Sequence, residues 1–123
     1  MGQVVHTLAE GEAVWGVTSL GDEVFVLRIK EREQVEVYDV ITYRLLRSIT
    51  LPNARGFGDI TSCEHYHCVY IGDHIVICIH RVDVLEGATT QWAVNDIPAG
   101  LSVTKAHNVL VTCENRRLQL GLL

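Results

Sequence analysis

Three similar tetrads recur at a fixed interval along the chain, and this spacing constrains the fold more than any other feature. They are Trp-Gly-Val-Thr at 15–18, Gly-Asp-Ile-Thr at 58–61 and Leu-Ser-Val-Thr at 101–104, so their first residues lie 43 positions apart both times. A short apolar stretch follows each tetrad. A period of about 40–45 residues built from short β-strands is typical of β-propeller blades. The repeat therefore predicts an all-β propeller chain with about three four-stranded blades.

Turn residues divide each repeat into short strands. The first repeat predicts strands at 15–19, 24–28, 34–39 and 45–51, and the second predicts strands at 59–63, 68–72, 77–83 and 90–94. The third predicts strands at 101–105, 109–113 and 117–120, with no fourth strand. A further apolar stretch at 4–8 precedes the first repeat at the distance expected for the missing fourth strand. The predicted half-propeller, 1–123, therefore divides into an orphan strand and linker (1–14), blade 1 (15–53), blade 2 (54–97) and three strands of blade 3 (98–123).

Three blades do not close a ring, since known propellers use about 4–8 blades. Unpaired sheet edges invite pairing with another chain, and two-fold homo-oligomers are the commonest closed assemblies. We therefore expect a homodimer of six blades, in which the N-terminal strand of each copy completes the last blade of the other. The alternative is a fragment or assembly unit with no ligand of its own. The residues expected to form the strand exchange are Val4, Val5, Leu8, Leu118 and Leu120.

Charge and hydropathy exclude several classes of protein. The formal net charge is −5, from 15 acidic and 10 basic residues, whereas nucleic-acid-binding proteins usually carry a basic excess. No apolar run approaches the 18 or so residues of a membrane span. The N-terminus lacks a basic region followed by an apolar stretch, so no signal peptide is expected and the cytoplasm is the default location.

Several segments resemble blades of NHL-type six-bladed propellers, most closely those of uncharacterised invertebrate proteins. They are Trp-Gly-Val-Thr (15–18), Val-Glu-Val-Tyr-Asp (35–39), Ile-Thr-Leu-Pro (49–52), Ile-His-Arg-Val-Asp (79–83), Gly-Leu-Ser-Val-Thr (100–104) and Asn-Val-Leu-Val-Thr-Cys (108–113). The resemblance covers nearly the whole chain, but this chain supplies only half a ring. It implies a platform that binds protein or RNA, and it implies no particular activity.

One face of the predicted propeller collects the loops between blades and the loops joining the second and third strands of each blade. Basic and acidic side chains mix on these loops, and such a rim suits a protein or peptide partner. No nucleophile elbow, phosphate-binding loop or metalloprotease motif occurs, so a non-enzymatic scaffold is expected. The candidate binding-face residues are Trp15, Arg28, Arg32, Arg55, His74, Arg116 and Arg117.

Cysteine and histidine cluster in Cys63-Glu64-His65-Tyr66-His67-Cys68. These are zinc-ligand types, but the spacing is too tight for four ligands to surround one ion, so no metal site is expected here. Cys63 and Cys68 should face each other across a hairpin, which leaves two interpretations open: a disulfide, or two thiols flanking a polar turn. Cys78 and Cys113 are expected to be buried apolar residues, and His80 and His107 have no obvious partner.

A calcium-dependent hydrolase or lyase is the alternative function. Oxygen-bearing side chains occur near the starts of the predicted first strands, and calcium prefers oxygen ligands. Ordinary turn chemistry explains the same residues, so no cofactor is expected. Asp39 and Asp83 repeat between blades and are interpreted as scaffold. The calcium candidates are Glu10, Glu12, Asn53, Asn95 and Asp59.

Overall fold

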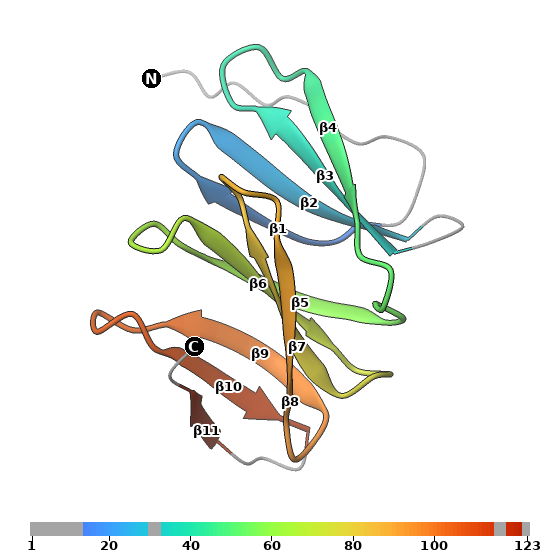
Figure 1. Ribbon diagram of the computed structural model, residues 1–123, viewed down its shortest axis with the longest axis vertical. Helices are drawn as coiled ribbons and strands as arrows, with labels where there is room; N and C mark the ends of the chain where they lie inside the picture. The colour runs from blue at the N-terminus through green and yellow to red at the C-terminus, as the bar shows by residue number, and fades with distance from the viewer. Residues whose placement is uncertain (1–13, 30–32, 115–117, 122–123) are drawn as a thin grey trace, which may run out of the picture.

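The computed structural model describes residues 14–29, 33–114 and 118–121. This part of the chain forms three separate antiparallel sheets, which follow one another along the long axis of the molecule (Figure 1). It contains no helix that could cross a membrane. The first sheet comprises β1 (Val14–Leu20), β2 (Glu23–Ile29), β3 (Glu33–Asp39) and β4 (Leu45–Thr50). The second comprises β5 (Phe57–Cys63), β6 (Cys68–Asp73), β7 (Cys78–Asp83) and β8 (Thr89–Ala93), and the third β9 (Pro98–Val103), β10 (Val109–Cys113) and β11 (Leu118–Gly121).

The all-β prediction is confirmed, and the predicted strands of all three repeats lie within about three residues of the observed ones. The largest difference is β9, which begins at Pro98 because a register shift lets Pro98 pair with Cys113 at the start of the strand. Proline is tolerated at a first strand position, where no ladder hydrogen bond is lost. The expected strand at 4–8, with Val4, Val5 and Leu8, lies outside the described residues, as do Arg32, Arg116 and Arg117. Leu118 and Leu120 belong to β11.

The first strands of the three sheets, β1, β5 and β9, are neighbours in space. Side-chain hydrogen bonds connect them. Ser62 Oγ in β5 donates to the Ser19 carbonyl in β1 over 2.7 Å. Asp59 Oδ2 accepts the Leu101 N–H of β9 over 2.8 Å. The sheets therefore meet at fixed positions along their first strands.

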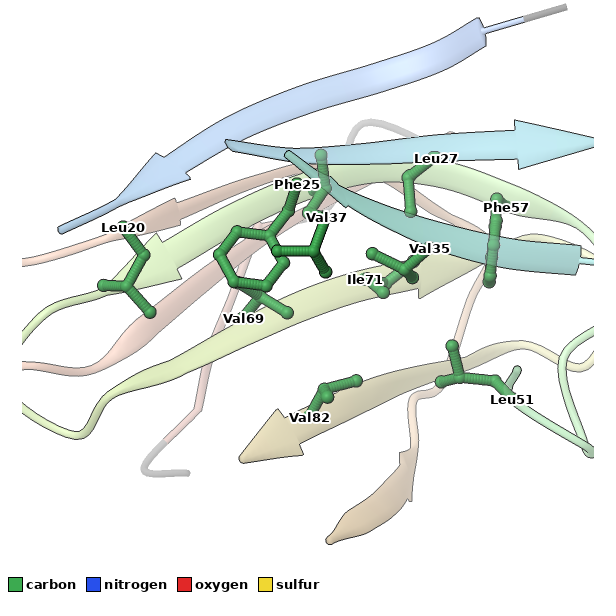
Figure 2. Packing of buried hydrophobic residues seen from close by; sticks show 11 residues of the cluster. Leu20, Phe25, Leu27, Val35, Val37, Leu51, Phe57, Val69, Ile71 and Val82 are labelled. Atoms are coloured by element: carbon green, nitrogen blue, oxygen red, sulfur yellow. The ribbon is translucent and has the colours of Figure 1, made fainter. Parts of the chain in front are cut away.

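Two apolar layers separate the three sheets. In the first layer, Phe25 and Val37 of the first sheet pack with Val69 and Ile71 of the second (Figure 2). In the second layer, Cys68 and Tyr70 pack with Val109 and Val111 of the third sheet. Successive side chains of a strand point to opposite faces, so β6 serves both layers. For that reason all six of its residues are buried.

Three hairpin turns share one design, in which an aspartate closes the strand and its carboxylate accepts the N–H groups two and three residues later. Asp39 does so for Ile41 and Thr42, and Asp83 for Leu85 and Glu86. The interpretation of these two aspartates as scaffold agrees with this role. Asp73 repeats the pattern in the β6–β7 turn. The fourth residue after each aspartate has positive φ: Tyr43 (59°), Ile77 (59°) and Gly87 (74°).

Candidate functional site

Two of the predicted binding-face residues, Arg55 and His74, lie on adjoining loops. The His74 N–H donates to the Gly56 carbonyl over 2.9 Å, which joins the β6–β7 turn to the β4–β5 connection. A Cβ on Gly56 would lie 2.6 Å from Ile75 Cγ1 and 2.8 Å from His74 Cε1, so this approach requires glycine. The side chains of Arg55 and His74 are both exposed. These two residues therefore lie on adjoining loops, and their role in binding stays a prediction.

A groove of about 580 Å³ runs beside these loops. Its charged groups are of opposite sign, with Glu33 from β3 and Arg55 from the β4–β5 connection. The Glu33 carboxylate also accepts the Phe57 N–H over 3.3 Å, which fixes the carboxylate at the groove. Such a mixture of apolar surface and two opposite charges suits a short peptide. The groove is lined by Glu33, Thr50, Leu51, Pro52, Ala54, Arg55 and Ile75.

Arg28 is not part of an exposed rim, so that prediction is wrong. Its Nε lies 2.9 Å from Glu36 Oε1, and both side chains are only 5 % exposed. Tyr38 donates its hydroxyl to the same carboxylate over 3.0 Å. Burial and the Glu36 carboxylate together raise the pKa of Tyr38 above its ordinary value. Arg28 follows Val24 and Val26 in the alternation of β2, so it lies on their face of the sheet, where Val26 is buried too, and not on a loop.

Trp15, the remaining described binding-face candidate, lies at an irregularity near the start of β1, where the register with β2 shifts between Val14 and Gly16. Its side chain is 56 % exposed. A strand irregularity of this kind turns a side chain out of the regular alternation. Trp15 is therefore available to a partner.

Cys63 and Cys68 face each other across the β5–β6 hairpin, as the sequence predicted, but both are free thiols. Of the two interpretations, thiols flanking a polar turn agrees with the structure and the disulfide does not. Both cysteines belong to the second apolar layer. Cys68 also hydrogen-bonds with Tyr70, whose pKa is raised first by burial and then by this neighbour.

One histidine of the same turn, His65, contacts a histidine of the third repeat. The rings of His65 and His107 stack at a centroid distance of 3.8 Å with 4° between their planes. Tyr66 meets the His65 ring edge-on at 4.6 Å, and the Arg81 guanidinium carbon lies 5.7 Å from the Tyr66 centroid. His107 therefore has a partner that the sequence did not reveal. In the described chain, the cysteines and histidines of 63–68 do not converge as a group of metal ligands.

The calcium candidates are dispersed among ordinary roles. Asp59 uses one carboxylate oxygen for its neighbour Ile60 N–H and the other for the Leu101 N–H. Asn53 and Asn95 are exposed on different connections. Glu10 and Glu12 lie outside the described residues. No oxygen-rich group of ligands forms among the candidates that the structure describes.

A buried polar cluster at the β6–β7 hairpin was not predicted. Asp73 Oδ2 lies 2.8 Å from His80 Nε2, which in turn lies 3.6 Å from Cys78 Sγ. All three side chains are buried. The register pairs Asp73 with Cys78, but Asp73 lies one residue beyond the predicted strand at 68–72, so the predicted strands did not place this pair. Contact with His80 required the side-chain conformations as well.

The protonation of this cluster is set by burial and by hydrogen bonds. Burial opposes ionisation of Asp73, but hydrogen bonds from His80 and from backbone N–H groups hold its pKa below the ordinary value. Burial and the negative charge of Asp73 raise the pKa of Cys78 to about 11. The thiol is therefore protonated at neutral pH. Both contacts of His80 use the same nitrogen, so the cluster lacks the relay geometry of a nucleophilic triad.

Comparison with known proteins gives the fold alone. No family model and no curated protein matches the chain. A chain of Kuenenia stuttgartiensis hydrazine synthase aligns with a TM-score of 0.73 at 14 % identity, over 92 % of this chain and 32 % of that one. A chain of a nidogen/laminin complex aligns with a TM-score of 0.73 at 13 % identity, over 89 % and 44 %. A KlHsv2 variant with loop 6CD replaced by a Gly-Ser linker aligns with a TM-score of 0.65 at 12 % identity, over 89 % and 35 %. This chain thus spans less than half the length of each of these solved chains.

Proposed function

We propose that the chain is a non-enzymatic β-propeller scaffold that supplies three blades and closes a six-bladed ring with a second copy. The ring presents a groove for a protein or peptide on the face that contains Arg55 and His74. The observation that carries this proposal is an apolar residue of the repeat, Val17, that is exposed in the first sheet although its counterparts contribute to apolar layers in the other two. The resemblance to NHL-type propellers supports the count of six.

The third residue of each tetrad occupies the same place in its sheet. Ile60 is 5 % exposed in the layer between the first two sheets, and Val103 packs against the layer between the second and third. Val17 is 62 % exposed. It lies opposite Val26, on the face of the first sheet that points away from the second. On this face Val26 is buried, but Val17 and Leu45 are 62 % and 51 % exposed; these two exposed residues are called the open face below.

The occupant of the open face is a second copy of the chain. At each of the two internal layers, the same two kinds of sheet face meet. Among the described residues, no sheet packs against the other face of the third sheet. The open face of one copy is therefore complementary to the outer face of the third sheet of another copy. Their contact closes a ring when the rotation between the copies brings the last sheet back to the first. Three sheets from each of two copies give six, within the range of about 4–8 found for propellers.

The mass in solution tests the assembly. We expect a single species of twice 13.7 kDa by light scattering after size exclusion. Val17→Asp should shift it to a single copy, because the substitution places a charge in the apolar contact. Leu85→Asp is the matched control, since Leu85 is 76 % exposed in a hairpin turn and should leave the mass unchanged. A wild-type chain that stays folded with the mass of one copy would contradict the proposal.

The groove is tested with peptides selected on the immobilised chain from a random display library. We expect enriched sequences to combine a charged residue with an apolar one, because Glu33 and Arg55 flank apolar surface. Arg55→Glu should weaken the selected peptides at least about tenfold, the loss expected for a charge-assisted contact worth about 1.5–3 kcal/mol. Arg44→Glu is the control, as this exposed arginine lies in the β3–β4 turn outside the groove. Equal binding by both variants would remove the groove from the proposal.

A further inference from the structure

Three side chains of metal-binding type converge where β6 and β7 meet. Asp73 Oδ2, Cys78 Sγ and His80 Nε2 all lie within 4.8 Å of one another, and the sulfur and nitrogen are 3.6 Å apart. Ligands of a tetrahedral zinc ion, with Zn–S of about 2.3 Å and Zn–N of about 2.0–2.1 Å, are separated by about the same distance. We propose that Asp73, Cys78 and His80 bind one Zn²⁺ ion between the first and second sheets. The proposal does not depend on the scaffold function.

The backbone holds the Asp73 carboxylate in one orientation. Oδ1 accepts the N–H groups of Ile75 and Val76 over 3.0 and 2.9 Å and that of Gly56 over 3.2 Å. Oδ2 accepts the Arg55 N–H over 2.9 Å, and it also lies 2.8 Å from His80 Nε2. Outer hydrogen bonds of this kind orient metal ligands in known sites. An ion would replace the contacts that His80 Nε2 makes with Asp73 Oδ2 and with Cys78 Sγ.

Charge balance favours a divalent ion in this buried position. A buried carboxylate is costly unless it is compensated, and for Asp73 the backbone N–H groups and His80 already supply part of that compensation. A Zn²⁺ ion bound by the Asp73 carboxylate, the Cys78 thiolate and a neutral His80 gives a site with no net charge. Binding forms a Zn–S bond and releases the Cys78 proton to solvent. His80 gives up the Nε2–H that it donates to Asp73, carries its proton on Nδ1 and coordinates through the Nε2 lone pair. Affinity should therefore rise with pH.

A cavity lies next to His80, the one proposed ligand that lines it. It has a volume of about 80 Å³, enough for water, and is bordered by polar residues. Zinc sites with three protein ligands commonly take water as the fourth. The residues lining the cavity are Leu51, Pro52, Asn53, His80, Thr89, Thr90 and Gln91.

The metal donors are particular to the second sheet. In the first sheet, the corresponding positions of the second and third strands hold Arg28 and Glu36, which form an ion pair without any metal. This place in the repeat thus accommodates a buried polar pair. Only in the second sheet, among those described, does it combine carboxylate, thiol and imidazole.

Cobalt(II) tests the site, because a thiolate ligand gives a charge-transfer absorption and tetrahedral geometry gives intense visible bands. The full chain, stripped with a chelator and titrated with Co²⁺ and then Zn²⁺, should bind one ion with both signatures. Cys78→Ser should abolish the charge-transfer band, and His80→Gln should weaken binding at least about 100-fold. Cys63→Ser and the double variant His65→Ala/His107→Ala are matched controls that should bind like the wild type.

A wild-type chain without the thiolate band would overturn the proposal, and this outcome would identify Asp73–His80 as a hydrogen-bonded pair only. Loss of binding in the surface double variant, with retention in Cys78→Ser, would overturn it too. Should Cys78→Ser fail to fold, alkylation of the wild-type chain mapped by mass spectrometry answers the same question. Bound zinc should slow modification of Cys78 much more than that of Cys113, and equal protection would contradict the site.

Discussion

Individual residues show where this chain accepts strain in order to form its turns. Ile77 has a φ of 59°, a conformation that glycine adopts freely and a β-branched residue adopts at a cost of about 1–2 kcal/mol. Its N–H donates to the Asp73 carbonyl over 3.0 Å, so the turn that positions Asp73 requires this conformation. The equivalent position of the β7–β8 turn is Gly87, with a φ of 74°. The strain at Ile77 therefore belongs to the hairpin that carries the proposed zinc site.

Ile77→Gly should raise the free energy of unfolding by about 0.5–1 kcal/mol. Relief of the positive-φ strain exceeds the extra backbone entropy that glycine loses on folding, which is about 0.5–1 kcal/mol. Little burial is lost, since Ile77 is 36 % exposed. Urea denaturation measures the change. Gly87→Ala provides the reciprocal test: nothing lies within 4 Å of its Cβ position, so the change in stability reports backbone strain minus the backbone entropy that alanine saves. A destabilised Ile77→Gly would show that packing of the isoleucine outweighs strain.

At the level of strands and sheets, much could be predicted from sequence because the signals are local. Alternation and turn residues placed β2, β6 and β10 almost to the residue. The buried pairs were beyond such reasoning, because they depend on which face of a sheet meets its neighbour. Arg28 was assigned to a surface by its charge, although it lies on the same face of β2 as Val24 and Val26 and is buried in an ion pair with Glu36. His80 and Asp73 are brought together by side-chain conformation across the β6–β7 hairpin, which no local pattern specifies.

The contact between β5 and β9 depends on Asp59, and this role can be tested. Asp59→Ala leaves the Leu101 N–H without its acceptor, at a cost of about 1–3 kcal/mol for an unsatisfied buried group. We expect faster hydrogen–deuterium exchange at Leu101 and its neighbours in β9, while β2 and β3 keep their protection. Asp59→Asn retains an acceptor oxygen and should exchange nearly like the wild type. Equal loss of protection in all three sheets would instead indicate that Asp59 supports the fold as a whole.

For the whole molecule, closure by a second copy makes stability depend on concentration. Anything that binds only the folded chain stabilises it by mass action, so the thermal midpoint of the wild type should rise with protein concentration. Joining two copies head to tail through a flexible linker makes the contact intramolecular, with an effective concentration in the millimolar range for a short linker. The fused chain should therefore unfold at a midpoint that is independent of concentration and above that of the dilute single chain.

The same fusion separates ring closure from open-ended association. Within one fused chain, both complementary faces can be satisfied at once, so light scattering should give the mass of a single fused molecule. Val17→Asp in both halves should break the contact between the halves and lower the thermal midpoint. Val17 is an apolar residue of the open face that is exposed in a single copy. A fused chain that still forms dimers or longer assemblies would mean that the faces meet at an angle that does not close. The contact would then produce a filament rather than a six-bladed ring.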